Sequence, residues 1–353
     1  MLDRYFSDRR TELLKLDGGA TVPLRFTDAH AEHLATRSAA GLFDFSFMGR
    51  YEVRGAGARA FLDRVQTRRL SRLADGRLFY TLLLQDDGSV LNDATLWEHG
   101  PEHYWLFTGR RSDFAWLERQ CRGDAVELAD QSAANAVLAL QGPRSAEILR
   151  RVPGASPGDL PYFHFGPARL AGVEAWIGRL GYSGELGYEI IVPAVAGAGL
   201  WRELLAAGRD AGLLECGFAA ADSLRIESGH ILFNRELGPG IDPFALGMER
   251  LLDLHGREFT GAAALRGRRR QPPRRRLAGI VPSARRGGGS PALPRAQVTS
   301  EAYSPVHGRS LALGFVDADG LAPGSALLLA DGRHARSARL PFYDPGRVLP
   351  RRG

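Results

Sequence analysis

The alternation of apolar and polar positions is clearest in residues 80–97, YTLLLQDDGSVLNDATLW. Two mainly apolar runs flank Asp-Asp-Gly at positions 86–88, a composition that is typical of a turn. The segment therefore predicts a hairpin of two strands. Because successive side chains on a strand point to opposite faces, one face of the second strand should carry four side chains: Leu91, Asp93, Thr95 and Trp97.

Asp93 is the unusual member of this face. Aspartate is depleted in strands, and burying its charge is costly unless a partner compensates it. Two interpretations follow from the pattern alone. Either Asp93 has a chemical role, or it lies at an open edge of the sheet, where water solvates it.

Single helices and short strands alternate over the first 265 residues. Helices are expected at residues 31–40, 58–65, 113–120, 145–152, 199–211 and 219–228. Strands are expected at residues 42–48, 51–54, 103–108, 137–140, 168–170 and 173–178. Because hairpins recur, this order favours an α+β fold with antiparallel sheets and flanking helices over a doubly wound parallel sheet.

The composition changes at residues 266–276, RGRRRQPPRRR. Pro272 and Pro273 oppose a helix, so a linker is expected there. From residue 277 to the end, short apolar segments separated by Gly, Pro and Asp predict a small all-β module, either a sandwich or a barrel. The arginine run would suit a phosphate-binding patch or a solvated linker. The linker is favoured, because no aromatic residues interleave to stack on bases.

The bulk composition excludes several classes of protein. With 353 residues, 44% hydrophobic and 24% charged, the chain can hold two or three domains with a buried core. The net charge of +6 comes almost entirely from arginine, since Lys15 is the only lysine. Because these charges are spread along the chain, they argue against nucleic-acid binding. The net positive charge would still favour an acidic ligand or an acidic partner protein.

The two cysteines, Cys121 and Cys216, lie far apart and show no CxxC spacing. Neither a disulfide framework nor a zinc site is therefore expected, and the pattern fits a reducing compartment. The N-terminus does not look like a signal peptide, and no apolar run reaches about 18 residues. The expectation is a cytoplasmic protein without a membrane segment or a metal.

Residues 179–193, RLGYSGELGYEIIVP, carry glycines spaced three apart. They lack the GxGxxG or GK[ST] order of nucleotide loops and run into a strand. Glycine permits close backbone approach to a flat ligand, on which Tyr182 and Tyr188 could stack. Glu189 could pair with adjacent N–H donors on a ring such as a 2-amino-4-oxo pteridine. A purely structural hairpin explains the same spacing.

Eight segments carry a resemblance that no single motif would support: AEHLATRSAAGLFDFSFMGRYEVRG, YTLLLQDDGSVLNDATLW, NAVLALQGPRSAEIL, RLGYSGELGYEIIVP, GFAAADSLRIESG, EFTGAAALRG, VTSEAYSPVHGRSLALGFV and LPFYDP. In this order, from about residue 20 to about residue 345, they resemble the folate-dependent aminomethyltransferase family, which includes the T-protein of the glycine cleavage system. The resemblance implies two folate-binding lobes in residues 1–265, a linker at 266–276 and a β-barrel in 277–353, around a central folate channel.

The resemblance also implies roles for five residues. Asp93 stands at the position of the family's essential aspartate, beside the folate nitrogens that receive the one-carbon unit. Met48 and Tyr80 match residues that contact folate and line its channel, and core packing would explain both as well. Tyr182 matches the tyrosine of the glycine-rich hairpin, and Glu189 matches the glutamate that reads the pteridine edge.

In the family reaction, an aminomethyl group on a carrier sulfur or nitrogen reaches tetrahydrofolate, giving 5,10-methylenetetrahydrofolate and releasing an amine. A fixed carboxylate would stabilise the cationic, iminium-like intermediate, hold the attacking nitrogen and relay a proton. The expected function is a tetrahydrofolate-dependent, aminomethyltransferase-like enzyme. Its expected partners are folate, a small or carrier-bound aminomethyl or methylamine donor, and an acidic carrier protein.

Four positions depart from the T-protein pattern: Phe47, Asn92, Gly109 and Ala221 replace a histidine, an aspartate, an asparagine and a folate-holding arginine. Phe47 and the pair Thr108-Gly109 resemble instead the folate domains of dimethylglycine and sarcosine dehydrogenases. This argues against a lipoyl-bound aminomethyl donor and leaves as an option an N-methyl or other methylated donor passed on from a separate oxidase or demethylase. The alternative is a non-catalytic folate-binding protein with an assembly or regulatory role. The Lys-Gly-Cys signature of such relatives is absent.

Overall fold

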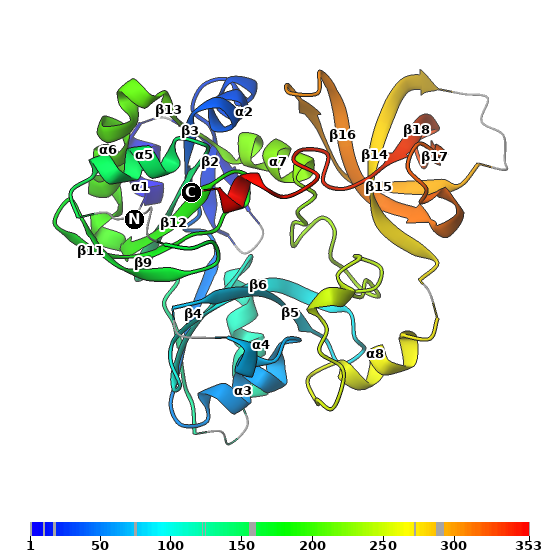
Figure 1. Ribbon diagram of the computed structural model, residues 1–353, viewed down its shortest axis with the longest axis horizontal. Helices are drawn as coiled ribbons and strands as arrows, with labels where there is room; N and C mark the ends of the chain where they lie inside the picture. Colours follow the sequence, from blue (N-terminus) through cyan, green and yellow to red (C-terminus); the bar gives the residue numbers. More distant parts are fainter. Residues whose placement is uncertain are drawn as a thin grey trace.

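Three parts surround the middle of the molecule: a sheet with helices, a second sheet and a barrel (Figure 1). The computed structural model describes residues 2–352 except residues 10, 17–18, 74–75, 122, 124, 155–159, 272 and 287–292. Within the described residues, no helix combines the length and the apolar composition that crossing a membrane requires.

The first part is a six-stranded sheet in the order β10-β11-β12-β9-β3-β13, antiparallel except for the pair β13 and β3. Its strands are β3 (Ala40–Asp44), β9 (Asn135–Gln141), β10 (Phe165–Leu170), β11 (Val173–Gly178), β12 (Gly187–Pro193) and β13 (Leu213–Glu215). The helices of this part are α1 (Leu2–Asp8), α2 (Ala29–Ser38), α5 (Ser145–Arg151), α6 (Gly197–Gly208) and α7 (Phe218–Glu227). A separate ribbon pairs β1 (Glu12–Lys15) with β2 (Thr21–Arg25). Phe6 of α1, Leu149 of α5 and Trp201 of α6 belong to one apolar core with this sheet.

The second part is a five-stranded antiparallel sheet in the order β5-β6-β7-β4-β8. Its strands are β4 (Gly49–Arg54), β5 (Leu78–Leu84), β6 (Val90–Gly100), β7 (His103–Thr108) and β8 (Glu127–Asp130). Helices α3 (Ala58–Val65) and α4 (Phe114–Gln120) pack on it through Phe61, Leu62 and Leu117. The central hairpin expected from the sequence is the pair β5 and β6.

The third part is a closed barrel in the order β14-β16-β15-β17-β18. Its strands are β14 (Arg275–Arg286), β15 (Arg295–Ser304), β16 (Arg309–Asp317), β17 (Ala326–Leu329) and β18 (Arg333–Ala338). Helix α8 (Ala262–Arg268) precedes the barrel, and Ile226 of α7 packs against Leu311 and Leu313 of β16. The barrel is thereby held against the first part.

An apolar cluster joins the two sheets. Phe43 and Val137 from the first sheet contact the same cluster as Trp97 and Phe107 from the second. The centre of the Trp97 ring lies 4.9 Å from the centre of the Phe107 ring and 4.9 Å from the centre of the Phe165 ring. Since the face of β6 that carries Trp97 also carries Asp93, this cluster fixes how the candidate site faces the first sheet.

The predicted fold class, an α+β fold with antiparallel sheets and a small C-terminal barrel, is confirmed. Helix α3 has the bounds predicted for it, but the strand expected at 42–48 ends at Asp44. Met48 N–H instead donates to Phe45 O at 3.2 Å and closes a turn. Helix α8 extends to Arg268, three residues into the expected linker, because its residues, AAALRGR, include good helix formers and Pro272 comes later. Pro272 itself lies outside the described residues, and the division at residues 266–276 stays a prediction.

Candidate active site

Asp93 lies in the interior of its sheet, since β6 is paired on both sides, with β5 and with β7. The interpretation of a solvated edge residue is therefore wrong. Tyr80 O–H donates a hydrogen bond to Asp93 Oδ2 at 2.8 Å, and Asn92 Oδ1 accepts the Asp93 backbone N–H at 2.9 Å. Burial raises the pKa of Asp93 to about 6, with smaller contributions from Asp113 and Glu236. The carboxyl group can therefore exchange a proton near neutral pH.

Two tyrosines flank this carboxylate. Burial and the Asp93 charge raise the pKa of Tyr80 well above its ordinary value, so Tyr80 stays protonated as the donor. Tyr182 O–H donates to Ile231 O, and its ring lies 5.5 Å from the stacked ring of His230. Burial likewise raises the pKa of Tyr182, and the Asp93 charge adds to this shift. Asp93, Tyr80 and Tyr182 therefore form one electrostatic group.

The variant Tyr80→Phe is expected to raise the pKa of Asp93 from about 6 to about 7. The hydrogen bond from Tyr80 stabilises the ionised carboxylate, so its loss favours the protonated form. The measurement is a carboxyl ¹³C NMR titration. Tyr104→Phe is the control, because Tyr104 O–H bonds to Glu98 and Pro101 O on the same sheet. An unchanged pKa in Tyr80→Phe would contradict the expectation.

Glu189 is a buried carboxylate that has no partner among the residues that the structure describes. It lies in the middle of β12, between Gly178 of β11 and Ala139 of β9, and is 5% exposed. No residue in the described part of the chain donates a hydrogen bond to it, and burial raises its pKa to about 7. It shares a face with Ile191, which belongs to the cluster between the sheets.

Tyr188 does not accompany Glu189. Its side chain is 1% exposed and lies in the core with α1, α5 and α6, on the opposite face of β12. The suggestion that Tyr188 stacks on a ligand beside Tyr182 is therefore wrong. Alternation along the strand explains this, because neighbouring residues point to opposite faces.

Met48 lies in the turn after β3 and is partly buried in the cluster between the sheets, together with Tyr182 and Phe47. Phe47 packs edge-on against Phe45 and Phe218, with ring centres 6.0 and 6.1 Å apart. The structure therefore brings Met48 and Tyr182 to one apolar surface. Four of the five predicted site residues lie in two adjoining groups that share Tyr182. Met48 and Tyr182 form one group, and Tyr80, Asp93 and Tyr182 form the other.

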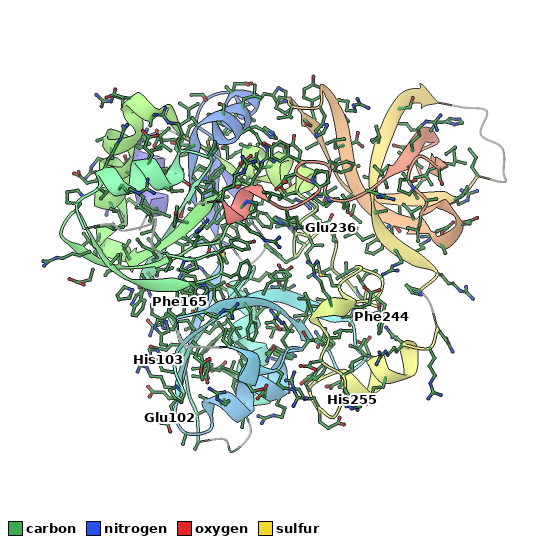
Figure 2. The ribbon with its side chains drawn as sticks, in the orientation of Figure 1. Glu102, His103, Phe165, Glu236, Phe244 and His255 are labelled. Carbon is green, nitrogen blue, oxygen red and sulfur yellow. The ribbon has the colours of Figure 1, made fainter. Side chains whose placement is uncertain are left out.

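A cavity of about 470 Å³ lies elsewhere and is lined by residues that include Phe244, Arg274 and Phe315. Figure 2 labels Phe244 on the segment between the second sheet and the barrel. None of the five predicted site residues lines it. We place the candidate site at Asp93 and Glu189 because carboxylates whose pKa values burial raises are found there, and no residue lining this cavity shows such a raised carboxyl pKa.

Two departures from the T-protein pattern have a steric explanation. A Cβ atom at Gly109 would lie 2.4 Å from Phe233 Cδ1, so glycine makes room for that ring. Ala221 is 7% exposed and borders a cavity of only about 10 Å³ with Phe43 and Phe218. This space does not admit an arginine side chain, so position 221 supplies no cation.

Asn92 has a structural reason to replace aspartate. Its side chain is buried, and Asn92 Nδ2 donates to Asp113 Oδ2 at 2.5 Å. Arg110 Nη2 lies 3.1 Å from the other oxygen of the same carboxylate. An aspartate at position 92 would set two carboxylates against each other.

The variant Asn92→Asp is expected to lower the free energy of unfolding at pH 7 by about 2–4 kcal/mol. Urea denaturation measures this loss. The loss should shrink at lower pH, where one carboxyl group of the pair takes up a proton. Asn234→Asp, at an exposed loop residue, makes the same charge change and should have little effect. Equal stability of the two variants would refute the expectation.

A buried ion pair near the site was not predicted. Arg225 Nη1 lies 2.8 Å from Glu236 Oε2, and both side chains are fully buried. The hydroxyl groups of Thr299 and Ser300 on β15 each donate to Glu236 Oε1 at 2.6 Å. Figure 2 shows Glu236 where the three parts meet. The partners are separated by many residues, and the loop sequence Asn-Arg-Glu gives no signal for such a pair.

Comparisons with known proteins identify the family of the chain. The family model described as GCVT N-terminal domain matches residues 8–256. The chain is 36% identical over 344 residues to the aminomethyltransferase of Moorella thermoacetica and 37% identical over 352 residues to that of Streptomyces avermitilis, with 92% of each chain covered in both cases. The solved structure of glycine cleavage system aminomethyltransferase T from Bartonella henselae superposes with a TM-score of 0.86 at 26% identity, covering 97% of both chains. The chain therefore belongs to the aminomethyltransferase family and is an enzyme of the T-protein type.

Proposed function

We propose that the enzyme transfers a one-carbon unit from an aminomethyl or N-methyl donor to tetrahydrofolate. The observation that carries this proposal is a pair of carboxylates with raised pKa values, the partly buried Asp93 and the buried Glu189, on two sheets that share one aromatic cluster. A buried carboxylate without a partner destabilises a fold. Such a group is retained where a ligand supplies the missing donors.

The residues present fit a pteridine ring. Within the described part of the chain, no group donates a hydrogen bond to Glu189, and a 2-amino-4-oxo pteridine offers adjacent N–H groups that match a carboxylate in a bidentate pair. Met48, Phe45 and Tyr182 provide an apolar surface for a flat ring. We assign Glu189 to hold the ring edge, and Met48 and Tyr182 to contact its faces. Bound tetrahydrofolate would supply the nucleophilic nitrogens that accept the one-carbon unit.

Asp93 carries the chemistry in this proposal. Above pH 6 its carboxylate is mainly ionised, and Tyr80 O–H fixes its orientation at 2.8 Å. A negative charge held in a site of low dielectric stabilises positive charge that develops on the transferred carbon. Because its pKa lies close to neutral pH, Asp93 can also accept a proton and return it.

The donor is proposed as an aminomethyl group on a carrier, or as an N-methyl amine that a separate oxidase has first oxidised by two electrons to the iminium level. T-proteins carry polar side chains at positions 109 and 221. In this chain the positions hold Gly109 and Ala221, and apolar neighbours occupy the space around them. This change favours a small methylated amine over a lipoyl arm. The net charge of +6 would favour an acidic carrier if one takes part.

Calorimetric titration of the enzyme with tetrahydrofolate tests the proposal. We expect micromolar affinity, followed by tetrahydrofolate-dependent formation of 5,10-methylenetetrahydrofolate when aminomethyl donors are screened directly and N-methyl amines are screened together with an amine oxidase that oxidises the N-methyl group to the iminium. The absence of binding would overturn the proposal. Binding without turnover by any donor of either class would favour a non-catalytic folate-binding role instead.

A further inference from the structure

Arg37, near the end of α2, is a buried cation that joins three segments of the first part. Its Nε and Nη2 atoms donate to Glu227 Oε2 on α7 at 3.0 and 2.7 Å. Its Nη1 atom donates to two groups of the turn at residues 183–185, namely Ser183 O at 2.9 Å and Glu185 Oε1 at 3.0 Å. The Arg37 side chain is only 5% exposed, so these contacts are made away from water. One guanidinium group therefore links α2 and α7 to this turn.

The turn at residues 183–185 lies between β11 and β12, directly after Tyr182. Gly184 has a φ angle of +80°, and a Cβ atom there would overlap Ser228 Oγ, so the turn packs closely against the end of α7. Ser228 Oγ donates to Ser183 O at 2.7 Å, the same carbonyl that the guanidinium holds. Two side chains thus fix the position of the Ser183 carbonyl, one residue after Tyr182.

Tyr182 is held by the segment that follows α7. Its O–H donates to Ile231 O, and its backbone carbonyl lies 3.1 Å from His230 Nδ1. Since a carbonyl only accepts, Nδ1 carries the proton. Burial lowers the pKa of His230 to about 4, and nearby positive charges, that of Arg37 among them, lower it further. The His230 ring that stacks on Tyr182 is therefore neutral, and Arg37 contributes to that state.

Glu227 gives the Arg37 guanidinium a fixed orientation. Its other carboxylate oxygen, Oε1, lies 3.1 Å from His33 Nε2 on α2 and accepts a hydrogen bond from the hydroxyl group of Ser304 on β15. The C-terminal tail, residues 341–352, returns from the barrel to the first part (Figure 1), and two of its N–H groups donate to Glu227 O at 2.8 and 3.0 Å. Because Glu227 is held from three sides, it is the rigid end from which Arg37 reaches the turn.

The direction of the Nη1 atom distinguishes this arrangement from an ion pair that only stabilises the fold. Charge neutralisation alone would need contacts of Arg37 with Glu185 and Glu227, and both carboxylates have them. Nη1 also donates to Ser183 O, an uncharged group that already has a hydroxyl donor. This further bond adds nothing to the charge balance, but it fixes the direction of the carbonyl next to Tyr182.

We propose that Arg37 is a positioning residue of the transferase site, acting through Tyr182 and without contacting the ligand itself. This role rests on the proposed function, in which Tyr182 contacts a face of the pteridine ring. By fixing the Ser183 carbonyl, Arg37 holds the Tyr182 ring in one orientation before the ligand binds. A surface that is ordered in advance costs less conformational entropy on binding. Lysine keeps the charge at this position, but its compact ammonium group cannot serve Glu227 and the turn together.

A double-mutant cycle on tetrahydrofolate affinity, measured by calorimetry, tests this role. Arg37→Lys is expected to weaken binding by about 10-fold in the unmodified background and by less than about twofold in Tyr182→Ala, because the ring that Arg37 positions is then absent. Arg257→Lys is the matched control. Arg257 is likewise buried, its Nη2 atom lies 3.2 Å from Asp63 Oδ1, and it donates to Gln66 O in the second part. This control should lower the urea midpoint as Arg37→Lys does, but leave tetrahydrofolate affinity unchanged in both backgrounds.

Ser228→Ala provides a second cycle in case Arg37→Lys does not fold, since it removes the other donor to the Ser183 carbonyl. It should weaken binding by about threefold, and only where the Tyr182 ring is present. Equal losses in the two backgrounds, or no loss in either, would overturn the positioning role while leaving the proposed function intact. If the unmodified enzyme does not bind tetrahydrofolate, the proposed function fails and the positioning role fails with it.

Discussion

Replacing Asp93 by asparagine is expected to lower turnover by about 1,000-fold or more while tetrahydrofolate affinity changes by less than about threefold. Asparagine has nearly the same shape and still accepts the hydrogen bond from Tyr80 O–H. Only the negative charge and the capacity to take up a proton are removed. If Asp93 stabilises positive charge on the transferred carbon, its removal affects the transition state and not the bound ligand.

Single-turnover formation of 5,10-methylenetetrahydrofolate measures the first quantity, and calorimetry measures the second. Asp86→Asn is the matched control, because Asp86 lies exposed in the turn of the same hairpin and the charge change is identical. A parallel loss of affinity and turnover in Asp93→Asn would assign Asp93 to binding alone. Turnover close to that of the unmodified enzyme would remove Asp93 from the mechanism.

The pH dependence follows from the same group. Because burial raises the pKa of Asp93 to about 6, turnover should fall as the pH drops below 6 and the carboxylate becomes protonated. This acidic limb should be absent from the residual activity of Asp93→Asn. The limb should move to higher pH in Tyr80→Phe, since the hydrogen bond that favours the ionised form is lost.

Strand periodicity was sufficient to single out Asp93, because an aspartate among apolar residues is rare inside a strand. The same periodicity could have excluded Tyr188 as a ligand contact. Tyr188 is next to Glu189 on the strand, so its side chain points to the opposite face of β12, into the core with α1, α5 and α6. The hydrogen-bond partner of Asp93 was harder to predict. Tyr80 pairs with Thr95 in the register of the hairpin and reaches Asp93 on the diagonal, so the contact depends on the register.

Local sequence signals predicted element types better than element ends. The strand expected at 42–48 was too long because Phe45 and Phe47 have high β propensity, yet both rings turn into the cluster between the sheets. The start of α2 was placed two residues late because the cap was overlooked: Asp28 accepts hydrogen bonds from His30 N–H and Ala31 N–H. Tertiary packing decided the first case and a local cap decided the second.

Contacts between distant segments could not be predicted from one sequence. Arg225 and Ser300 are 75 residues apart, and Arg347 and His230 are 117 residues apart. Neither pair has a motif, because the fold of the barrel and the path of the tail create both contacts. The sequence therefore indicated the candidate site residues on β6 and β12, whereas the charged residues around them could be identified only from the structure.

Replacing Glu189 by glutamine is expected to have two opposite effects. Tetrahydrofolate affinity should fall by about 100-fold or more, because a bidentate, charge-assisted pair with the ring is lost. The ligand-free enzyme should become more stable at pH 8, because the variant removes a buried carboxylate that has no partner among the described residues. A residue that serves only the fold would not show this combination.

The sign of the stability effect follows from proton linkage. Burial raises the pKa of Glu189 from 4.5 to about 7, so the folded state holds a proton that the unfolded state releases between these values. Stability is therefore lost as the pH rises through this window, by up to about 3 kcal/mol at pH 8. The advantage of Glu189→Gln over the unmodified enzyme should shrink to about 1 kcal/mol at pH 5.

Urea denaturation at pH 8 and pH 5 measures the stability, and calorimetry with tetrahydrofolate measures the affinity. Glu174→Gln on β11 is the control, because Glu174 belongs to the same sheet and its side chain is 81% exposed. Neither quantity should change in that variant. A loss of stability in Glu189→Gln at pH 8 would mean that the fold itself needs the carboxylate. Unchanged affinity would show that another group reads the ring edge.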